Sequence, residues 1–134
     1  MTTSRRWLIA ALVAGIAYLF IGRFPVPPTN LQAWRLAAWA ASGVVFAVHI
    51  WNEHFRERQT PVRTAIHTAV GVAIGGFGLA VFGLIHSYIA TSAIGPLWLL
   101  ALAAWPAVTA IPAFIAAFVA TSILARMPRA MGRL

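Results

Sequence analysis

Four long apolar segments make up most of this sequence, and they exclude almost every fold that is soluble in water. They cover residues 7–24, 31–54, 62–89 and 97–125. A helix needs about 20 residues to cross the hydrocarbon core of a bilayer, and each segment is close to that length or longer. With 61% hydrophobic and 9% charged residues, the chain also has too little polar surface to cover a core in water. The sequence therefore predicts an all-α polytopic membrane protein, a four-transmembrane-helix bundle.

The connections between the segments are short and contain residues that begin or end helices. A proline-rich stretch separates the first two segments, and Thr29 or Asn30 is suited to cap the helix that follows. Thr60 can cap the third helix, with Pro61 at its first position, where a missing N–H group costs nothing. No connection is long enough to divide the chain. We therefore expect a single integral membrane domain over residues 1–134.

The first segment also has features of a secretory signal peptide, because Arg5 and Arg6 precede its apolar run. That run is long, and it ends at Arg23 and a proline cluster instead of a small-residue cleavage site. We therefore expect the segment to remain in the protein as a transmembrane helix.

The basic residues are all arginine, and they are distributed unevenly along the chain. Eight of the ten fall at the two termini and around the connection between the second and third segments: Arg5, Arg6, Arg56, Arg58, Arg63, Arg126, Arg129 and Arg133. Arginine is enriched in cytoplasmic loops, which predicts a bacterial-type inner membrane protein with both termini in the cytoplasm. The arginines form no basic domain, so we expect no nucleic-acid binding. The expected partners are the lipid bilayer and either other membrane subunits or further copies of the chain.

The second segment has the most regular polar pattern in the chain. Seven of its residues recur at alternating steps of four and three: Arg35, Trp39, Ser42, Phe46, His49, Glu53 and Arg56. This spacing keeps one stripe of a helix facing a neighbouring helix. The third segment contains many small residues that permit close approach. We therefore expect these two helices to be antiparallel neighbours, with Gly71 and Gly75 beneath the His49 stripe.

Depth along the second and third helices predicts that His49, Glu53 and His67 form one cluster. His49 and Glu53 are four residues apart and share a helix face. His49 and His67 lie at similar depths, about 10 Å from the connection between the helices. Glu53 is also one of only two carboxylates in the chain. An ionisable group within a membrane is costly and usually has either a partner or a task, so the cluster is a candidate functional site.

Several interpretations of this cluster are open. His49 and His67 could ligate the iron of a haem b, with Arg56, Arg58 or Arg63 pairing with its propionates. The two histidines and Glu53 could instead bind a divalent metal, and either cofactor would suggest a membrane redox subunit. Glu53 could also carry protons in a small proton-coupled transporter. In a purely structural cluster, Glu53 would pair with Arg56 or Arg63, and the two histidines would hydrogen-bond across the hairpin.

The sequence lacks the components of many catalytic sites. It contains no Cys and no Asp, which excludes disulfides, thiolate ligands and a Ser-His-Asp arrangement. No loop is long enough to form a separate active-site domain. We therefore expect no enzymatic activity, and we predict a non-catalytic accessory or assembly subunit of a membrane complex. The redox subunit and the proton-coupled transporter are the alternatives.

Overall fold

The computed structural model describes residues 3–25 and 28–127, and every regular element in these ranges is helical. The long helices are α1 (Thr3–Arg23), α2 (Leu31–Trp51), α3 (Pro61–Thr91) and α4 (Pro96–Arg126). A 3-10 turn (Pro28–Asn30) precedes α2, and a single π turn (Asn52–Arg56) follows it. All four long helices are long and apolar enough to cross a membrane. The predicted all-α membrane fold of four spanning helices is confirmed.

The helix ends follow the local signals in the sequence. The hydroxyl oxygen of Thr60 accepts a hydrogen bond of 3.4 Å from the backbone N–H of Arg63, and Pro61 begins α3. Asn30 precedes α2 as expected, but its side chain makes no capping hydrogen bond. At its other end α3 stops at Ser92, which adopts a left-handed conformation with φ of 54°.

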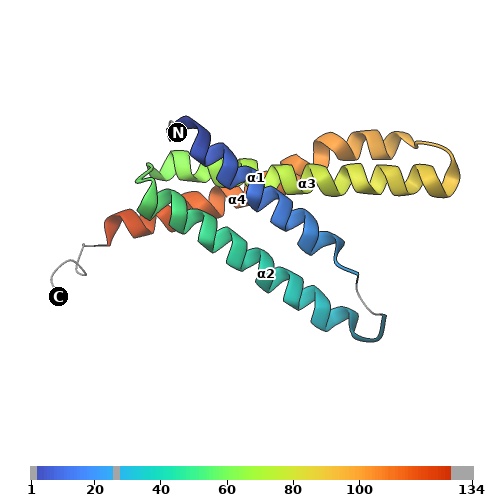
Figure 1. Cartoon of the computed structure of the whole chain (residues 1–134), viewed down its shortest axis with the longest axis horizontal. Helices are drawn as coiled ribbons and strands as arrows, with labels where there is room; N and C mark the ends of the chain where they lie inside the picture. Colours follow the sequence, from blue (N-terminus) through green and yellow to red (C-terminus); the bar gives the residue numbers. More distant parts are fainter. Residues whose placement is uncertain (1–2, 26–27, 128–134) are drawn as a thin grey trace.

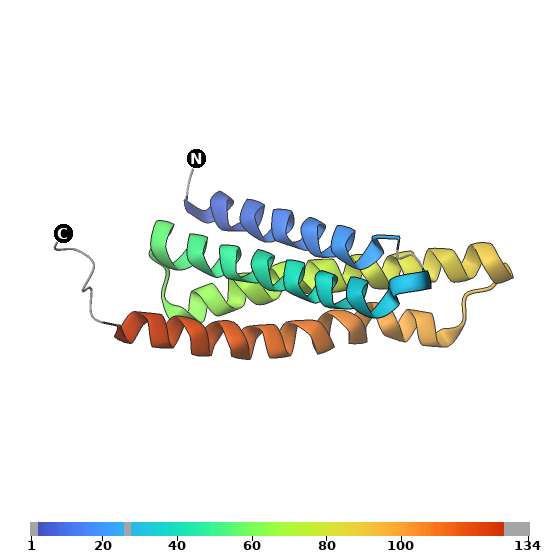
Figure 2. The same ribbon diagram turned by 90° about the horizontal axis from the view of Figure 1, so that it is seen from below.

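The four helices run alternately in opposite directions. The start of α1, the connection between α2 and α3, and the end of α4 all lie at one end of the molecule (Figures 1 and 2). The α1–α2 and α3–α4 connections lie at the other end. The first end carries six of the eight arginines that the sequence groups together, whereas Arg129 and Arg133 lie outside the described residues. Four spans place both ends of the helical region on the same side of a membrane.

α3 is the central helix and packs mainly against α4 and α1. Small residues allow the backbones of α1 and α3 to approach closely. A Cβ atom added at Gly75 would lie 2.6 Å from the Cβ of Tyr18 and 3.1 Å from the backbone oxygen of Gly15. One added at Gly71 would lie 3.3 Å from the backbone oxygen of Ala11. The pairs Ala11/Gly15 and Gly71/Gly75 therefore form matching small-xxx-small surfaces on α1 and α3.

The prediction that α2 covers both glycines of this α3 surface is wrong. Gly71 does contact His49 of α2, but Gly75 lies against α1. A surface of small residues accepts any helix that can approach closely, and α1 presents small residues of its own at the matching positions. α1 therefore occupies most of the α3 face that the sequence assigned to α2.

α2 packs against α3 and α4 through its C-terminal half, whereas Trp34 in its first half stacks on Phe24 at the end of α1. Ile50 and Phe46 pack in one apolar cluster with Ala65 of α3 and Ala117 of α4. The first half of α2 lies away from α3 and α4, because the α1–α2 hairpin diverges from the α3–α4 hairpin (Figure 1). Trp39 is 79% exposed in this half of the helix. The predicted stripe therefore faces neighbouring helices near Phe46, His49 and Glu53, but not near Arg35 and Trp39.

Candidate functional site

The candidate site begins where α2 changes to a π turn at Asn52–Arg56. The backbone N–H of Glu57 donates to the carbonyl of Asn52, and the N–H of Gln59 donates to the carbonyl of Glu53, both at 3.1 Å. A π turn widens the helix locally, and such turns occur frequently at functional sites. This turn contains Glu53, the carboxylate that the sequence placed in the site.

Glu53 and His67 form a buried hydrogen-bonded pair between α2 and α3. The side chain of Glu53 is 0% exposed, and its Oε2 lies 2.6 Å from Nδ1 of His67. With Glu53 ionised, the Nδ1–H group of His67 donates this bond, which is short and strengthened by charge. Trp7 of α1 stacks on the His67 ring, with centroids 4.3 Å apart and planes inclined by 9°. The pair is therefore held by three helices.

His49 lies one helical turn from Glu53, further from the α2–α3 connection, and packs against α3. It is 5% exposed, and a Cβ atom at Gly71 would be 3.2 Å from its Cε1 atom. His49 precedes Glu53 by four residues, and Gly71 follows His67 by four residues. The contacts of His49 with Gly71 and of Glu53 with His67 therefore define one antiparallel register. Neither ring nitrogen of His49 has a hydrogen-bond partner among the described residues. Of the three residues predicted to form one cluster, Glu53 and His67 are in direct contact, and His49 lies one turn away.

Two threonines add further unpaired polar atoms on the α3 face that carries His67. Thr64 and Thr68 are fully buried, and their hydroxyls have no hydrogen-bond partner in the described residues. Thr109 and Thr121 of α4, by contrast, each donate to the carbonyl four residues earlier. A buried polar group without a partner costs about 1–3 kcal/mol. The unpaired hydroxyls and the free Oε1 of Glu53 therefore identify this end of the bundle as a place where stability is not optimised.

The predicted pairing of Glu53 with an arginine is wrong. Arg56 and Arg63 are both exposed, and among the described residues the partner of Glu53 is His67. The long arginine side chains keep their charge in the polar surroundings near the helix ends, where it is best solvated. The other carboxylate, Glu57, lies 3.9 Å from Arg6. The predicted hydrogen bond between His49 and His67 is also not formed.

The sequence reasoning missed Trp7, Thr64 and Thr68. The threonines could have been found, because Thr64, His67, Thr68 and Gly71 recur at helical spacing on one face of α3. Trp7 carried no such signal. Its contact with His67 depends on α1 packing against α3, which the spacing of residues in α1 alone does not reveal.

The geometry gives little support to a metal or a haem. Among the described residues, no three His, Cys, Asp or Glu side chains are arranged to hold a metal ion. The contact between His49 and Gly71 brings α2 and α3 too close at that level to admit a porphyrin between His49 and His67. The haem and metal interpretations stay predictions on which we base no function.

An open groove of about 700 Å³ runs between α1 and α2 beside the cluster. Its walls are mostly apolar and include Val13 and Ala17 of α1 and Val48 of α2. His49 lies in the groove wall, and arginine side chains lie at the end nearest the α2–α3 connection. The groove is therefore amphipathic along its length.

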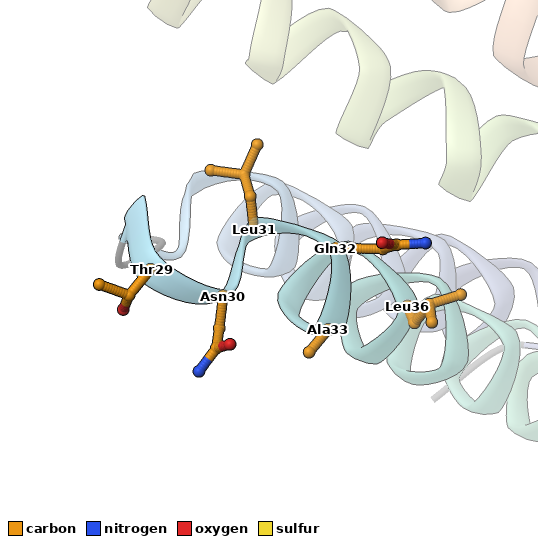
Figure 3. A pocket seen from close by; sticks show the side chains of 6 residues that line it. All are labelled: Thr29, Asn30, Leu31, Gln32, Ala33 and Leu36. Carbon is orange, nitrogen blue, oxygen red and sulfur yellow. The ribbon is translucent and has the colours of Figure 1, made fainter.

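A second hollow, of about 540 Å³, lies at the opposite end of α2 (Figure 3). Six consecutive or nearly consecutive residues line it: Thr29, Asn30, Leu31, Gln32, Ala33 and Leu36. Their side chains point in different directions, and the hollow contains no histidine, carboxylate or arginine (Figure 3). It is not part of the candidate site.

Comparisons with known protein families, with characterised protein sequences and with solved structures give no match for this chain.

Proposed function

We propose that the chain is a small proton-coupled transporter in which Glu53 and His67 exchange protons. The observation that carries the proposal is the buried hydrogen bond of 2.6 Å between the carboxylate and the imidazole. Ionisable groups inside membrane proteins are expensive to bury and commonly serve as proton relays. A carboxylate bonded to an imidazole can gain or lose a proton while the contact between the two side chains persists. Such a pair can change charge during a transport cycle.

The surroundings of the pair support this role. His49 lies one turn further from the α2–α3 connection and lines the α1–α2 groove, and its ring nitrogens have no partner within residues 3–25 and 28–127. The hydroxyls of Thr64 and Thr68 can each donate and accept a hydrogen bond. Of these groups, His49 is the one that lines the groove and so connects it to the Glu53–His67 pair. A transported solute would interact with the pair from this direction.

We further propose that the protein resides in a bacterial-type inner membrane with both termini in the cytoplasm. The support is the concentration of arginines at one end of the bundle, which follows the positive-inside rule. Reporter fusions at the C-terminus and beside Arg58 are expected to report cytoplasm. A reporter signal from the opposite side at either position would reverse the assignment.

The transporter proposal can be tested by measuring charge movement in reconstituted protein. Liposomes on a solid-supported sensor would receive jumps of pH and of separate solute classes: metal cations, organic cations, amino acids and sugars. We expect transient currents with at least one class for the wild type and for Glu57→Gln, and none for Glu53→Gln. Glu57→Gln is the matched control because it removes the only other side-chain carboxylate. Equal currents in Glu53→Gln, or no current in the wild type, would contradict transport.

The exposed first half of α2 favours a second candidate, an accessory or assembly subunit of a membrane complex. Trp39 is 79% exposed and Leu36 65% exposed on a helix that the rest of the bundle does not cover. A neighbouring subunit or a second copy of the chain could cover this half. A defined complex that dissociates on Trp39→Arg, together with absent currents, would support this role over transport.

A further inference from the structure

We infer that the groove between α1 and α2 binds one anionic glycerophospholipid, with its phosphate at Arg6 and Arg56 and an acyl chain along the groove. This inference goes beyond the proposed function and does not depend on it, since a lipid can occupy the groove whether or not Glu53 exchanges protons. Three features of the groove carry it: the charges at its mouth, the unpaired polar side chain in its wall, and its apolar interior.

The mouth of the groove carries two arginines and one carboxylate. Arg6 and Arg56 both line it, as does Glu57, so these three residues give a net positive charge. Glu57 lies 3.9 Å from Arg6, at the limit of an ion pair, and the Arg6 side chain is 59% exposed. The guanidinium of Arg6 is therefore free to bind a stronger anion. Basic pockets between transmembrane helices are a recurrent binding site for anionic lipid headgroups.

The groove wall contains polar groups at the depth of a lipid's glycerol and ester region. Asn52 lies one turn from Arg56, and His49 lies almost one turn further, so that His49 is about 10 Å from Arg56 along the helix axis. The His49 side chain is nine-tenths buried or more, and neither ring nitrogen has a hydrogen-bond partner in the part of the chain that the structure describes. A lipid ester carbonyl or glycerol hydroxyl would give this imidazole a hydrogen bond. A free inorganic anion at the mouth would not reach it.

The remainder of the groove is apolar and continues inward from His49. Val13 and Ala17 of α1 face Val44 and Val48 of α2 across it. These side chains offer no hydrogen bond to a polar ligand but pack well against a hydrocarbon chain. The order of charge, hydrogen-bonding group and apolar surface along the groove thus matches the order of phosphate, ester and acyl chain in a glycerophospholipid.

The test is native mass spectrometry of the full chain from nanodiscs that contain phosphatidylglycerol and phosphatidylcholine in equal amounts. We expect one phosphatidylglycerol to be retained in preference to phosphatidylcholine. Arg6→Gln and Arg56→Gln should each reduce that preference roughly five-fold, whereas Arg126→Gln, which does not line the groove, should leave it unchanged. Soluble glycerol phosphate should not displace the lipid, because the acyl chain contributes to binding.

A second pair of variants tests the apolar part of the groove without changing its charge. Ala17→Phe should fill the groove and abolish lipid retention, while Leu12→Phe on another face of α1 should not. Equal retention of the two lipids, displacement by glycerol phosphate, or equal behaviour of Ala17→Phe and Leu12→Phe would each overturn the inference. The second pair keeps the test decisive if an arginine variant fails to fold.

Discussion

The two halves of α2 have the same helical pattern but very different surroundings. The C-terminal half, around Phe46 and His49, packs against α3 and α4 and leads into the π turn that contains the fully buried carboxylate of Glu53. The first half has exposed residues at nearly every position, including Trp39. Polar residues on a helical stripe are therefore buried only where a neighbouring helix is present to receive them.

The contrast also shows how the bundle holds a polar cluster. The close contact of α1 with α3 and the approach of the last turns of α2 form a compact end with little water-accessible space around Glu53. At the other end, the two hairpins diverge (Figure 1). Exposed apolar side chains there, such as Leu36 and Trp39, are left for lipid or another subunit to cover. The compact end is where we place the proton exchange, and the open end is where another subunit could pack.

The largest expected effect comes from disrupting the α1–α3 contact that supports the compact end. Gly75→Leu would place a large side chain against Tyr18 and the backbone of Gly15, and should lower the free energy of unfolding by about 3 kcal/mol. Gly43→Leu is the control, because a Cβ atom there meets nothing within 4 Å. Thermal unfolding in detergent measures both. Equal losses of stability would show that α1 and α3 do not pack through these glycines.

A matched pair of truncations compares the two halves of α2 directly. Phe46→Ala removes packing against Ala65 and Ala117 and should cost about 2 kcal/mol. Trp39→Ala removes a larger but exposed side chain and should change stability by less than about 0.5 kcal/mol. Denaturant titration in detergent gives both values. A larger cost for Trp39→Ala would mean that an oligomer or partner covers the first half of α2.

The smallest expected effects concern buried threonine hydroxyls. Thr121 donates a hydrogen bond of 2.7 Å to the carbonyl of Ala117, so Thr121→Val should lower stability by up to about 1 kcal/mol. Thr68 has no such bond, so Thr68→Val should leave stability unchanged or raise it by about the same amount. The thermal midpoint should therefore fall for Thr121→Val and should not fall for Thr68→Val. A loss of stability on Thr68→Val would reveal a hydrogen-bond partner for that hydroxyl.

Much of the fold was predictable from the sequence, because bilayer thickness fixes helix length and proline fixes several helix starts. The connection at Thr60 and Pro61 was therefore located correctly, and depth along the helices correctly brought Glu53 and His67 together. The position of α1 was not predictable, since Gly71 and Gly75 can receive any helix with a small-residue face. The expected pairing of Glu53 with Arg56 or Arg63 is not formed, because both arginine side chains are exposed and extend into polar surroundings.

The most direct test of the central claim is infrared spectroscopy of the Glu53 carboxyl group. Glu57→Gln leaves Glu53 as the only side-chain carboxylate, so acid-minus-alkaline difference spectra of that variant report mainly on it. We expect these spectra to contain a carboxylic-acid C=O band that disappears when Glu53→Gln is added and shifts in frequency when His67→Ala is added. A spectrum without this band, or a band that His67→Ala leaves unchanged, would contradict a proton-exchanging Glu53–His67 pair.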